Sequence, residues 1–240
     1  MRHLALAFLL AACAAPGGAV DPTVTPRPAD TAPSEVAAAR AHVVAVYVNV
    51  TCDNLADAEE RGTGFWVNSG VVATAGHAMD VRDRMFPDFA VVGPDGCRNG
   101  RYADWFQHVD LLFIMVQGRH EGAVAFRDAP AAPGEPLWQY VFQGRNDLDR
   151  SGIFSPMRVE AEALDDGSRV FFGSRPAPAK GDSGAPVFDA RGRLVGMTQA
   201  IGSYPDRPAF GRIGVHLNGF VILHYLRQCA GGGPCGDETP

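Results

Sequence analysis

Short apolar segments separated by turn-forming residues are the most constraining feature of this chain, and they begin at about Glu35. Candidates for long amphipathic helices are few. Strands of this length and spacing are typical of an all-β sandwich or a pair of barrels. The sequence predicts strands over residues 42–50, 64–68, 71–74, 89–92, 110–116, 138–143, 157–164, 169–172, 185–189, 194–198 and 213–217.

Two local features refine this all-β prediction. Gly192 lies between the predicted strands 185–189 and 194–198, where its access to positive φ suits a tight hairpin turn. Residues 218–228 carry apolar side chains at roughly helical spacing, so we expect one helix there with one face packed against a barrel. With 240 residues and 46% hydrophobic content, the chain can bury one good-sized core or two small barrels that share an interface.

The charge pattern argues against one class of partner. The formal net charge is -6, and the sequence contains no run of Lys or Arg that could bind along a phosphate backbone. Nucleic acid is therefore not an expected partner. No CxxC pair or Cys/His cluster offers four metal ligands at familiar spacing. We therefore expect neither a metal nor another cofactor, and we expect a monomer.

The first twelve residues predict an export signal. A short positive region at residues 1–3 precedes an apolar stretch, residues 4–12, that is too short to span a bilayer. The stretch ends in LAAC, residues 10–13, which resembles the lipobox of bacterial lipoproteins, where the signal is removed before the cysteine and the thiol is acylated. An ordinary signal peptide with an incidental Cys13 is the alternative interpretation.

A lipidated Cys13 would hold the protein at a membrane surface. Residues 14–33 contain five prolines among Gly, Thr, Ala and Asp, a composition typical of an extended, unfolded spacer. Ala14 rather than Asp follows the cysteine, and by resemblance to Gram-negative lipoproteins this favours the periplasmic face of the outer membrane, with secretion as the alternative. The expected organisation is a signal peptide 1–12, a lipidated tether 13–34, a folded domain 35–229 and a Gly-rich tail 230–240.

The other four cysteines fit an oxidising compartment. Cys52, Cys97, Cys229 and Cys235 are an even number, and they allow two disulfides in three connectivities among which the sequence does not choose. Cys52 with Cys97 is the preferred pairing. Cys229 and Cys235 are close along the chain and could close a small loop.

Three segments carry residues suited to nucleophilic catalysis. His77 ends the segment TAGH, residues 74–77, directly after an apolar strand. Asp110 opens the apolar run DLLFIMV, and a carboxylate that enters a buried strand must be paired or hydrogen bonded to stay charged. Ser183 lies within GDSGAP, residues 181–186. Taken singly, the histidine and the aspartate each have a structural explanation as well.

Together the three segments resemble those of the trypsin-like (chymotrypsin-fold) serine proteases. In that family GDSG-x-P surrounds the nucleophile, TAGH or TAAH carries the base, and Asp followed by two hydrophobic residues carries the orienting acid. Base, acid and nucleophile follow one another along the chain in that order, as they do here. The resemblance covers about residues 42–226 and implies two packed six-stranded antiparallel β-barrels with a C-terminal helix and a site in the cleft between the barrels.

The resemblance also implies a serine endopeptidase that hydrolyses protein or peptide substrates through an acyl-enzyme. A serine hydroxyl is a poor nucleophile near neutral pH, so His77 is expected to take the proton of Ser183 while Asp110 orients the imidazole. The backbone amides of Gly181 and Ser183 are expected to form the oxyanion hole. The substrate-binding positions implied by the resemblance are Ala177, Thr198, Gln199, Ala200, Ile201 and His216.

The chain departs from the family pattern in two places. No Ile-Val-Gly-Gly-like start follows a basic cleavage site, so Asp182 needs a partner other than a newly formed N-terminal amine. Ala177 stands where enzymes selective for Lys or Arg carry an aspartate, so basic selectivity is not supported, and small or apolar side chains are the expected preference. His216 is either a determinant of acidic selectivity, as a histidine is in glutamyl endopeptidases, or a histidine satisfied within the pocket or core.

Three alternatives compete with the protease interpretation. An α/β-hydrolase would use Ser183 with Asp206 and either His216 or His224, but GDSGAP is not a G-x-S-x-G elbow and strands and helices do not alternate. A protease fold without activity, serving as an envelope scaffold or binding module, is the second alternative. A serine esterase that is not a protease is the third.

Overall fold

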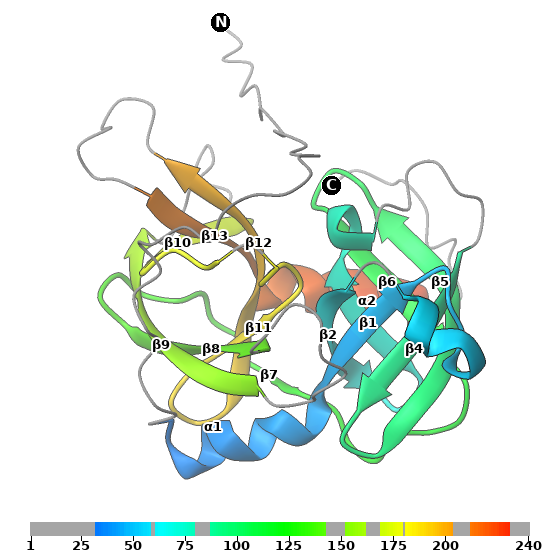
Figure 1. The fold of residues 1–240 in the computed structure, drawn as a ribbon. Helices are drawn as coiled ribbons and strands as arrows, with labels where there is room; N and C mark the ends of the chain where they lie inside the picture. The colour runs from blue at the N-terminus through cyan, green and yellow to red at the C-terminus, as the bar shows by residue number, and fades with distance from the viewer. Residues whose placement is uncertain are drawn as a thin grey trace, which may run out of the picture.

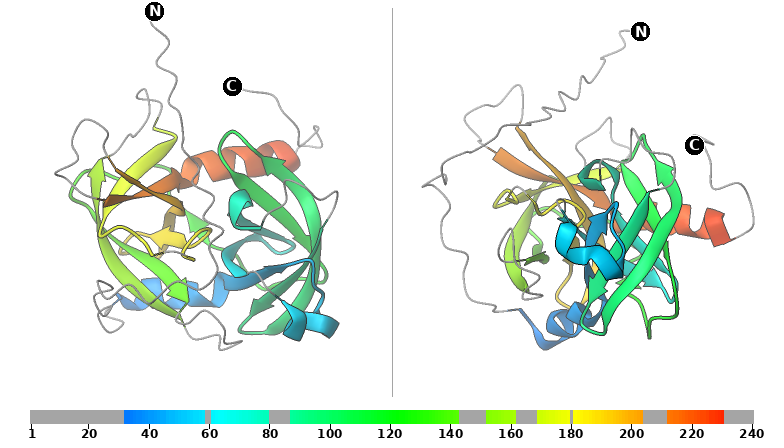
Figure 2. Two further views of the ribbon diagram at one scale, coloured as in Figure 1. Left: turned by 45° about the horizontal axis from the view of Figure 1, so that its top comes forward. Right: turned by 45° about the vertical axis from the view of Figure 1, so that its right-hand side comes forward.

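The apolar segments of the chain close into two β-barrels that lie side by side (Figures 1 and 2). This computed structural model describes residues 32–58, 61–79, 87–142, 152–161, 169–179, 181–203 and 212–230. The expected signal peptide, Cys13, nearly all of the expected tether, Cys235 and the expected Gly-rich tail after Ala230 lie outside the described residues. No helix among those that the structure describes is long and apolar enough to cross a membrane.

The first barrel is a closed antiparallel sheet of six strands in the order β1-β2-β3-β6-β5-β4. Its strands are β1 (Val43–Val48), β2 (Arg61–Asn68), β3 (Val71–Ala75), β4 (Asp88–Gly93), β5 (Gly96–Phe106) and β6 (Leu111–Val116). Five of the six overlap the strands that the sequence predicts.

The second barrel has the order β11-β8-β9-β10-β13-β12 and is closed by pairing between β11 and β12. Its strands are β8 (Pro136–Phe142), β9 (Gly152–Ala161), β10 (Phe171–Arg175), β11 (Pro186–Phe188), β12 (Arg193–Ser203) and β13 (Arg212–Asn218). The short β7 (Ala125–Phe126) pairs in parallel with β12. Gly192 in the β11–β12 turn has φ +70°, which confirms the predicted hairpin. The fold class predicted from the sequence is therefore confirmed.

Short helices connect and flank the barrels. They are α1 (Ser34–Ala38), η1 (Ala39–His42), η2 (Cys52–Asp57), η3 (Gly76–Met79) and α2 (Gly219–Ala230). The predicted C-terminal helix is confirmed, and in Figure 2 α2 runs from the second barrel across to the first. Tyr225 of α2 packs against Phe106 of the first barrel, with ring centroids 4.2 Å apart, so the helix links the two barrels.

Strands β2 and β6 are buried on both faces, and this burial explains why both faces carry apolar side chains. Trp66, Leu112 and Ile114 point into the first barrel. Their neighbours Phe65 and Phe113 point outwards into a second cluster, which also contains residues of the second barrel and α2. Since successive side chains of a strand alternate between its faces, a strand that is buried on both sides reads as a continuous apolar run.

Strand β5 was not predicted, because its sequence GCRNGRYADWF shows neither an apolar run nor clean alternation. Most of its side chains are only half-buried. Its place is set by main-chain pairing with β4 on one side and β6 on the other. Closure of the barrel therefore supplies the hydrogen bonds that hold a strand with weak intrinsic preference.

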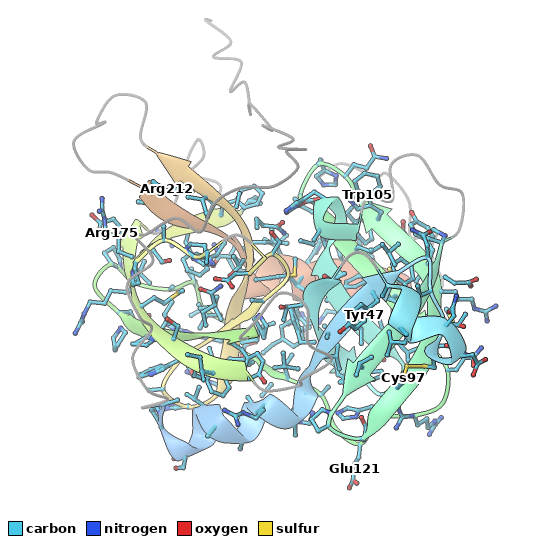
Figure 3. All side chains as sticks on the ribbon, in the orientation of Figure 1. Tyr47, Cys97, Trp105, Glu121, Arg175 and Arg212 are labelled. Carbon is cyan, nitrogen blue, oxygen red and sulfur yellow. A yellow bond between two sulfur atoms is a disulfide. The ribbon has the colours of Figure 1, made fainter. Side chains whose placement is uncertain are left out.

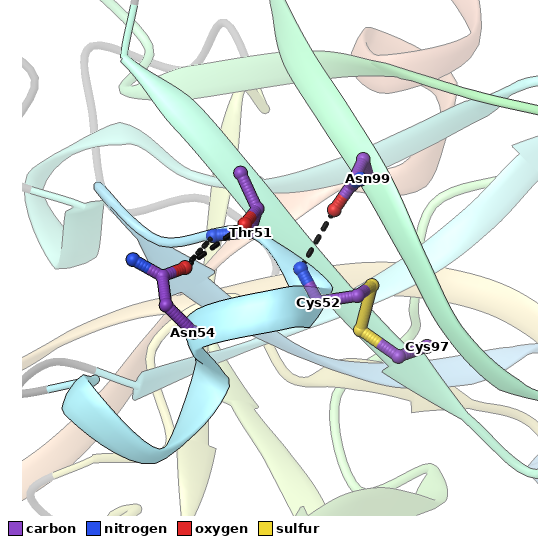
Figure 4. Close-up of a disulfide and its surroundings, with 5 residues drawn as sticks. All are labelled: Thr51, Cys52, Asn54, Cys97 and Asn99. Atoms are coloured by element: carbon purple, nitrogen blue, oxygen red, sulfur yellow. Dashed lines mark hydrogen bonds between the residues drawn. A yellow bond between two sulfur atoms is a disulfide. The ribbon is translucent and has the colours of Figure 1, made fainter.

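A disulfide joins Cys52 of η2 to Cys97 of β5, which confirms the preferred pairing (Figure 4). The Cys52 amide also donates to Asn99 Oδ1 at 2.7 Å, and the Thr51 amide donates to Asn54 Oδ1 at 2.6 Å. The disulfide and the Cys52–Asn99 hydrogen bond attach η2 to the first barrel, and the Thr51–Asn54 hydrogen bond caps the start of η2. The suggested Cys229–Cys235 pairing involves a residue outside the described part of the chain.

Replacing both Cys52 and Cys97 with serine is expected to lower the free energy of unfolding by about 4 kcal/mol. The bond joins two residues with a sequence separation of 45. Without it the unfolded chain regains the conformational entropy that the closed loop had removed, which stabilises the unfolded state. Chemical denaturation measures the change. Cys52→Ser alone should cost as much as the double substitution, because either breaks the same bond, and a clearly smaller single effect would contradict this explanation.

Candidate active site

His77 is placed by the end of β3. The strand stops at Ala75, and η3 then turns the chain so that His77 faces the second barrel. The Gly76 amide donates to the carbonyl oxygen of Asp110 at 3.1 Å. The indole of Trp105, at the upper end of the first barrel in Figure 3, lies against Gly76 and leaves no room for a side chain there.

Asp110 lies in the turn before β6 and not within the strand. It has φ +54°, in the left-handed region that aspartate enters more readily than most residues. Its Oδ1 accepts from the backbone amide of His77 at 2.8 Å, and its Oδ2 is in close contact with His77 Nδ1. The side chains of His77 and Asp110 are 28% and 26% exposed, so solvent reaches the pair although the protein covers most of its surface.

Ser183 completes the arrangement from the second barrel. Its Oγ is 3.0 Å from Nε2 of His77, although the two residues are 106 positions apart in the sequence. The imidazole therefore lies between a carboxylate at Nδ1 and a hydroxyl at Nε2. The structure brings together the three residues that the sequence singled out.

The turn before Ser183 requires glycine. The Asp182 amide donates to the carbonyl of Ala179 at 3.2 Å, closing a four-residue turn whose third residue, Gly181, has φ +97°. Glycine adopts such a positive φ without the steric cost that other residues incur. Asp182 is 5% exposed, and its Oδ2 accepts from the Ala179 amide at 2.8 Å. This hydrogen bond supplies a partner for Asp182 within its own turn.

Gly184 attaches the Ser183 turn to the first barrel. Its φ is +82°, and a Cβ there would lie 2.0 Å from the carbonyl oxygen of Thr63. The Thr63 amide donates to the carbonyl of Ser183 at 3.2 Å, and the Thr74 hydroxyl donates to the Thr63 carbonyl at 2.7 Å. The backbone of Ser183 is therefore fixed on the same strands that lead to His77. Nothing in the sequence pattern had assigned Thr63 this function.

The expected substrate-binding residues differ in their accessibility. Ala200 is exposed, and Ala177 and Ile201 are half-buried. Thr198 is 1% exposed, Gln199 is 5% exposed and His216 is fully buried. Three of the six expected positions therefore present little surface to a substrate in this structure.

His216 forms a second Ser–His contact, which differs from the first in its surroundings. Its Nε2 is 2.6 Å from Ser174 Oγ, and its Nδ1 is 3.2 Å from Thr198 Oγ1. His216 and Ser174 are both 0% exposed, and the Phe172 ring stacks on the imidazole at 4.8 Å. Burial lowers the pKa of His216 from 6.5 to about 3. A neutral, hydrogen-bonded histidine in the core agrees with the second interpretation that the sequence left open.

Acid is expected to destabilise the fold through His216. Because the folded pKa is depressed, the neutral ring contributes stability that is fully present above pH 6.5 and is lost as the pH falls towards 3. The loss from this group approaches about 1.4 kcal/mol per pH unit within that window. Urea denaturation between pH 7 and 4.5 measures it.

Two comparisons isolate the contribution of His216. His216→Gln should remove this contribution and so reduce the acid dependence, whereas replacement of the exposed His224 on α2 by glutamine should leave it unchanged. In the folded wild type, the NMR signals of the His216 ring should remain those of a neutral imidazole down to about pH 4. A ring that becomes protonated near pH 6 would contradict the assignment.

Residues 62–197 match the sequence model of the trypsin-like peptidase domain, more than half of the chain. Two barrels with a histidine, an aspartate and a serine meeting between them agree with this class of peptidase. The chain therefore belongs to the trypsin-like peptidase family. No curated protein matches it significantly by sequence.

Solved structures show the same fold at low sequence identity. The active form of the Rv3671c protease from M. tuberculosis matches with a TM-score of 0.64 and 19% identity over 92% of this chain and 96% of that one. Its inactive form gives a TM-score of 0.61 with 18% identity over 85% and 98%. The serine endoprotease from Yersinia pestis gives 0.61 with 15% identity over 81% and 64%.

Proposed function

We propose that this protein is a serine endopeptidase whose triad is His77, Asp110 and Ser183. The observation that carries the proposal is the imidazole of His77, which lies 3.0 Å from the Ser183 hydroxyl on one side and contacts the Asp110 carboxylate on the other. Membership of the trypsin-like peptidase family supports a peptide bond as the substrate.

In the proposed first step, Ser183 Oγ attacks the carbonyl carbon of the scissile peptide while His77 Nε2 takes the hydroxyl proton. Asp110 holds the proton of the imidazole on Nδ1 and stabilises the imidazolium that forms, without becoming protonated itself. The negative charge moves to the former carbonyl oxygen. The backbone amides of Gly181 and Ser183 are proposed to donate to that oxygen, in the turn that the positive φ of Gly181 forms.

The tetrahedral intermediate then collapses. The carbon–nitrogen bond breaks, His77 gives its proton to the leaving amine, and the acyl group stays on Ser183. Water attacks this ester in the second half of the reaction, again with His77 as the base, and releases the acid product and the free serine. Ala177 in place of an aspartate supports a preference for small or apolar side chains in the primary pocket.

The test combines a covalent probe with peptide cleavage. The purified full-length chain is treated with a fluorophosphonate, its intact mass is measured, and a peptide library is digested in parallel. One adduct, absent from His77→Ala and from heat-denatured protein, together with cleaved peptides, is the expected result. An adduct without peptide cleavage would indicate a serine esterase, and no adduct on folded wild type would indicate an inactive protease fold.

We also propose that the protein is exported and anchored in the bacterial envelope through an acylated Cys13, facing the periplasm. The basis is the sequence of residues 1–33 alone. Metabolic labelling with palmitate should mark the wild type and fail to mark Cys13→Ala. Equal labelling of the two would contradict the anchor.

A further inference from the structure

Gln199 of β12 lies where the family resemblance implies a substrate-binding residue, but the residue is only 5% exposed. Its Nε2 is 3.4 Å from the carbonyl oxygen of Val109 and 3.3 Å from that of Asp110, both in the first barrel. Its own carbonyl oxygen is 3.5 Å from Ser183 Oγ. One residue therefore contacts the backbone of the proposed acid through its side chain and the proposed nucleophile through its main chain.

A β-bulge explains why this side chain leaves the face of its strand. Thr198 pairs with His216 and Ala200 pairs with Val215, so Gln199 is the extra residue with no partner position on β13. An extra residue of this kind bends the strand and redirects its side chain, and such bulges are frequent beside active sites. The bulge turns Gln199 towards the Asp110 turn, while its neighbour Ala200 is exposed.

The turn that contains Asp110 presents carbonyl oxygens to which an amide group can donate. Asp110 has φ +54°, and the carbonyl groups of residues 109 and 110 both face the single Gln199 amide group. An amide nitrogen carries two hydrogens, so one side chain can donate to both oxygens. The Asp110 carbonyl also accepts from the Gly76 amide at 3.1 Å. The backbone of the proposed acid is thus held from both barrels.

The oxygen end of the Gln199 amide indicates that the hydrogens on Nε2 set the orientation of the amide group. Gln199 Oε1 is buried and has no hydrogen-bond partner among the described residues. A buried acceptor without a partner is unfavourable, so the amide is not oriented by its oxygen. Turning the amide over would place that oxygen against two carbonyl oxygens.

We propose that Gln199 is a positioning residue that holds Asp110 against His77, and that it does not contact the substrate side chain. This inference rests on the proposed triad. Both Asp110 carboxylate oxygens face His77, so a rotation of the Asp110 backbone would move them away from Nδ1 and the His77 amide. Gln199 restricts that rotation and couples it to the position of Ser183.

The experiment replaces Gln199 with methionine, which has nearly the same length and shape and no donor. The wild type, Gln199→Met and the matched control Gln139→Met are compared. Gln139 is a 2% exposed glutamine of β8 in the second barrel, and its Nε2 has no partner among the described residues. Kinetics are measured on peptides that differ only in the residue before the cleaved bond.

For Gln199→Met we expect kcat to fall about 10- to 100-fold with KM within about threefold, since a small misplacement of a catalytic group costs this much. The loss should be equal for all the peptides, and fluorophosphonate labelling should slow by the same factor. The proton NMR signal of the His77–Asp110 hydrogen bond should broaden or move. Gln139→Met should match the wild type in all three measurements.

A loss that appears in KM or varies with the peptide side chain would overturn the inference and return Gln199 to the substrate pocket. Unchanged kinetics would overturn it as well. If Gln199→Met fails to fold, Gln199→Asn makes the same test, because it keeps the buried amide and only shortens its reach. Wild-type protein that does not react with the fluorophosphonate would contradict the proposed function itself. Wild-type protein that is labelled, with Gln199 variants that are unaffected, would contradict only this inference.

Discussion

Replacing Ser183 with alanine is expected to lower kcat for peptide hydrolysis by about 10⁶-fold, because serine hydrolases that lose the nucleophile lose nearly all covalent catalysis. The alanine side chain keeps Cβ and the backbone of the turn. The Ser183 carbonyl can still accept from the Thr63 amide at 3.2 Å, and Gly184 keeps its packing against Thr63. The free energy of unfolding should change by less than about 0.5 kcal/mol.

Steady-state kinetics and thermal unfolding measure this result, and Ser174→Ala is the matched control. Ser174 also has a histidine nitrogen within hydrogen-bond distance, but it is fully buried against His216. Its replacement should leave fluorophosphonate labelling intact and reduce stability, since His216 would lose a partner. If Ser174→Ala abolished labelling and Ser183→Ala did not, the assignment of the nucleophile would be wrong.

Replacing Asp110 with asparagine is expected to slow turnover by about 10⁴-fold. The amide keeps the shape of the carboxylate, and its oxygen can still accept from the His77 amide at 2.8 Å. The amide nitrogen then faces Nδ1 as a donor, which forces Nδ1 to be an acceptor and moves the imidazole proton to Nε2. With its proton on Nε2, His77 can no longer accept the proton of Ser183.

The measurement is kcat/KM on the best peptide, with Asp88→Asn as a control for the loss of a negative charge. Asp88 is an exposed residue of β4. That control should retain wild-type activity. A loss of only a few-fold in Asp110→Asn would mean that the tautomer of His77 is set by another group.

Burial separates the two Ser–His pairs of this protein more clearly than distance does. The contact between Ser174 and His216, at 2.6 Å, is shorter than the contact between Ser183 and His77, at 3.0 Å. The first is sealed in the second barrel, and its other ring nitrogen faces a threonine hydroxyl. The second is accessible, and its other ring nitrogen faces a carboxylate. Only the second arrangement combines access for a substrate with stabilisation of an imidazolium.

Much of the fold could be predicted because its signals are local. Apolar strands such as β1 and β6 are visible as runs, and Gly192 marks a hairpin at the position where the structure has it. Strand β5 and the five-residue α1 could not be predicted in this way. The half-polar β5 owes its conformation to partners on both sides, and α1 is anchored by the buried side chain of Val36.

Local sequence patterns predict most of the strands, the glycines that the turns around Ser183 require, and the order of histidine, aspartate and serine along the chain, but they miss strand β5. Which of these groups meet depends on the packing of the two barrels. His77 and Ser183 come from different barrels, and Gln199 reaches Asp110 only because a bulge redirects it across the interface. Propensity and periodicity act over a few residues, whereas these contacts depend on how two closed sheets pack against each other.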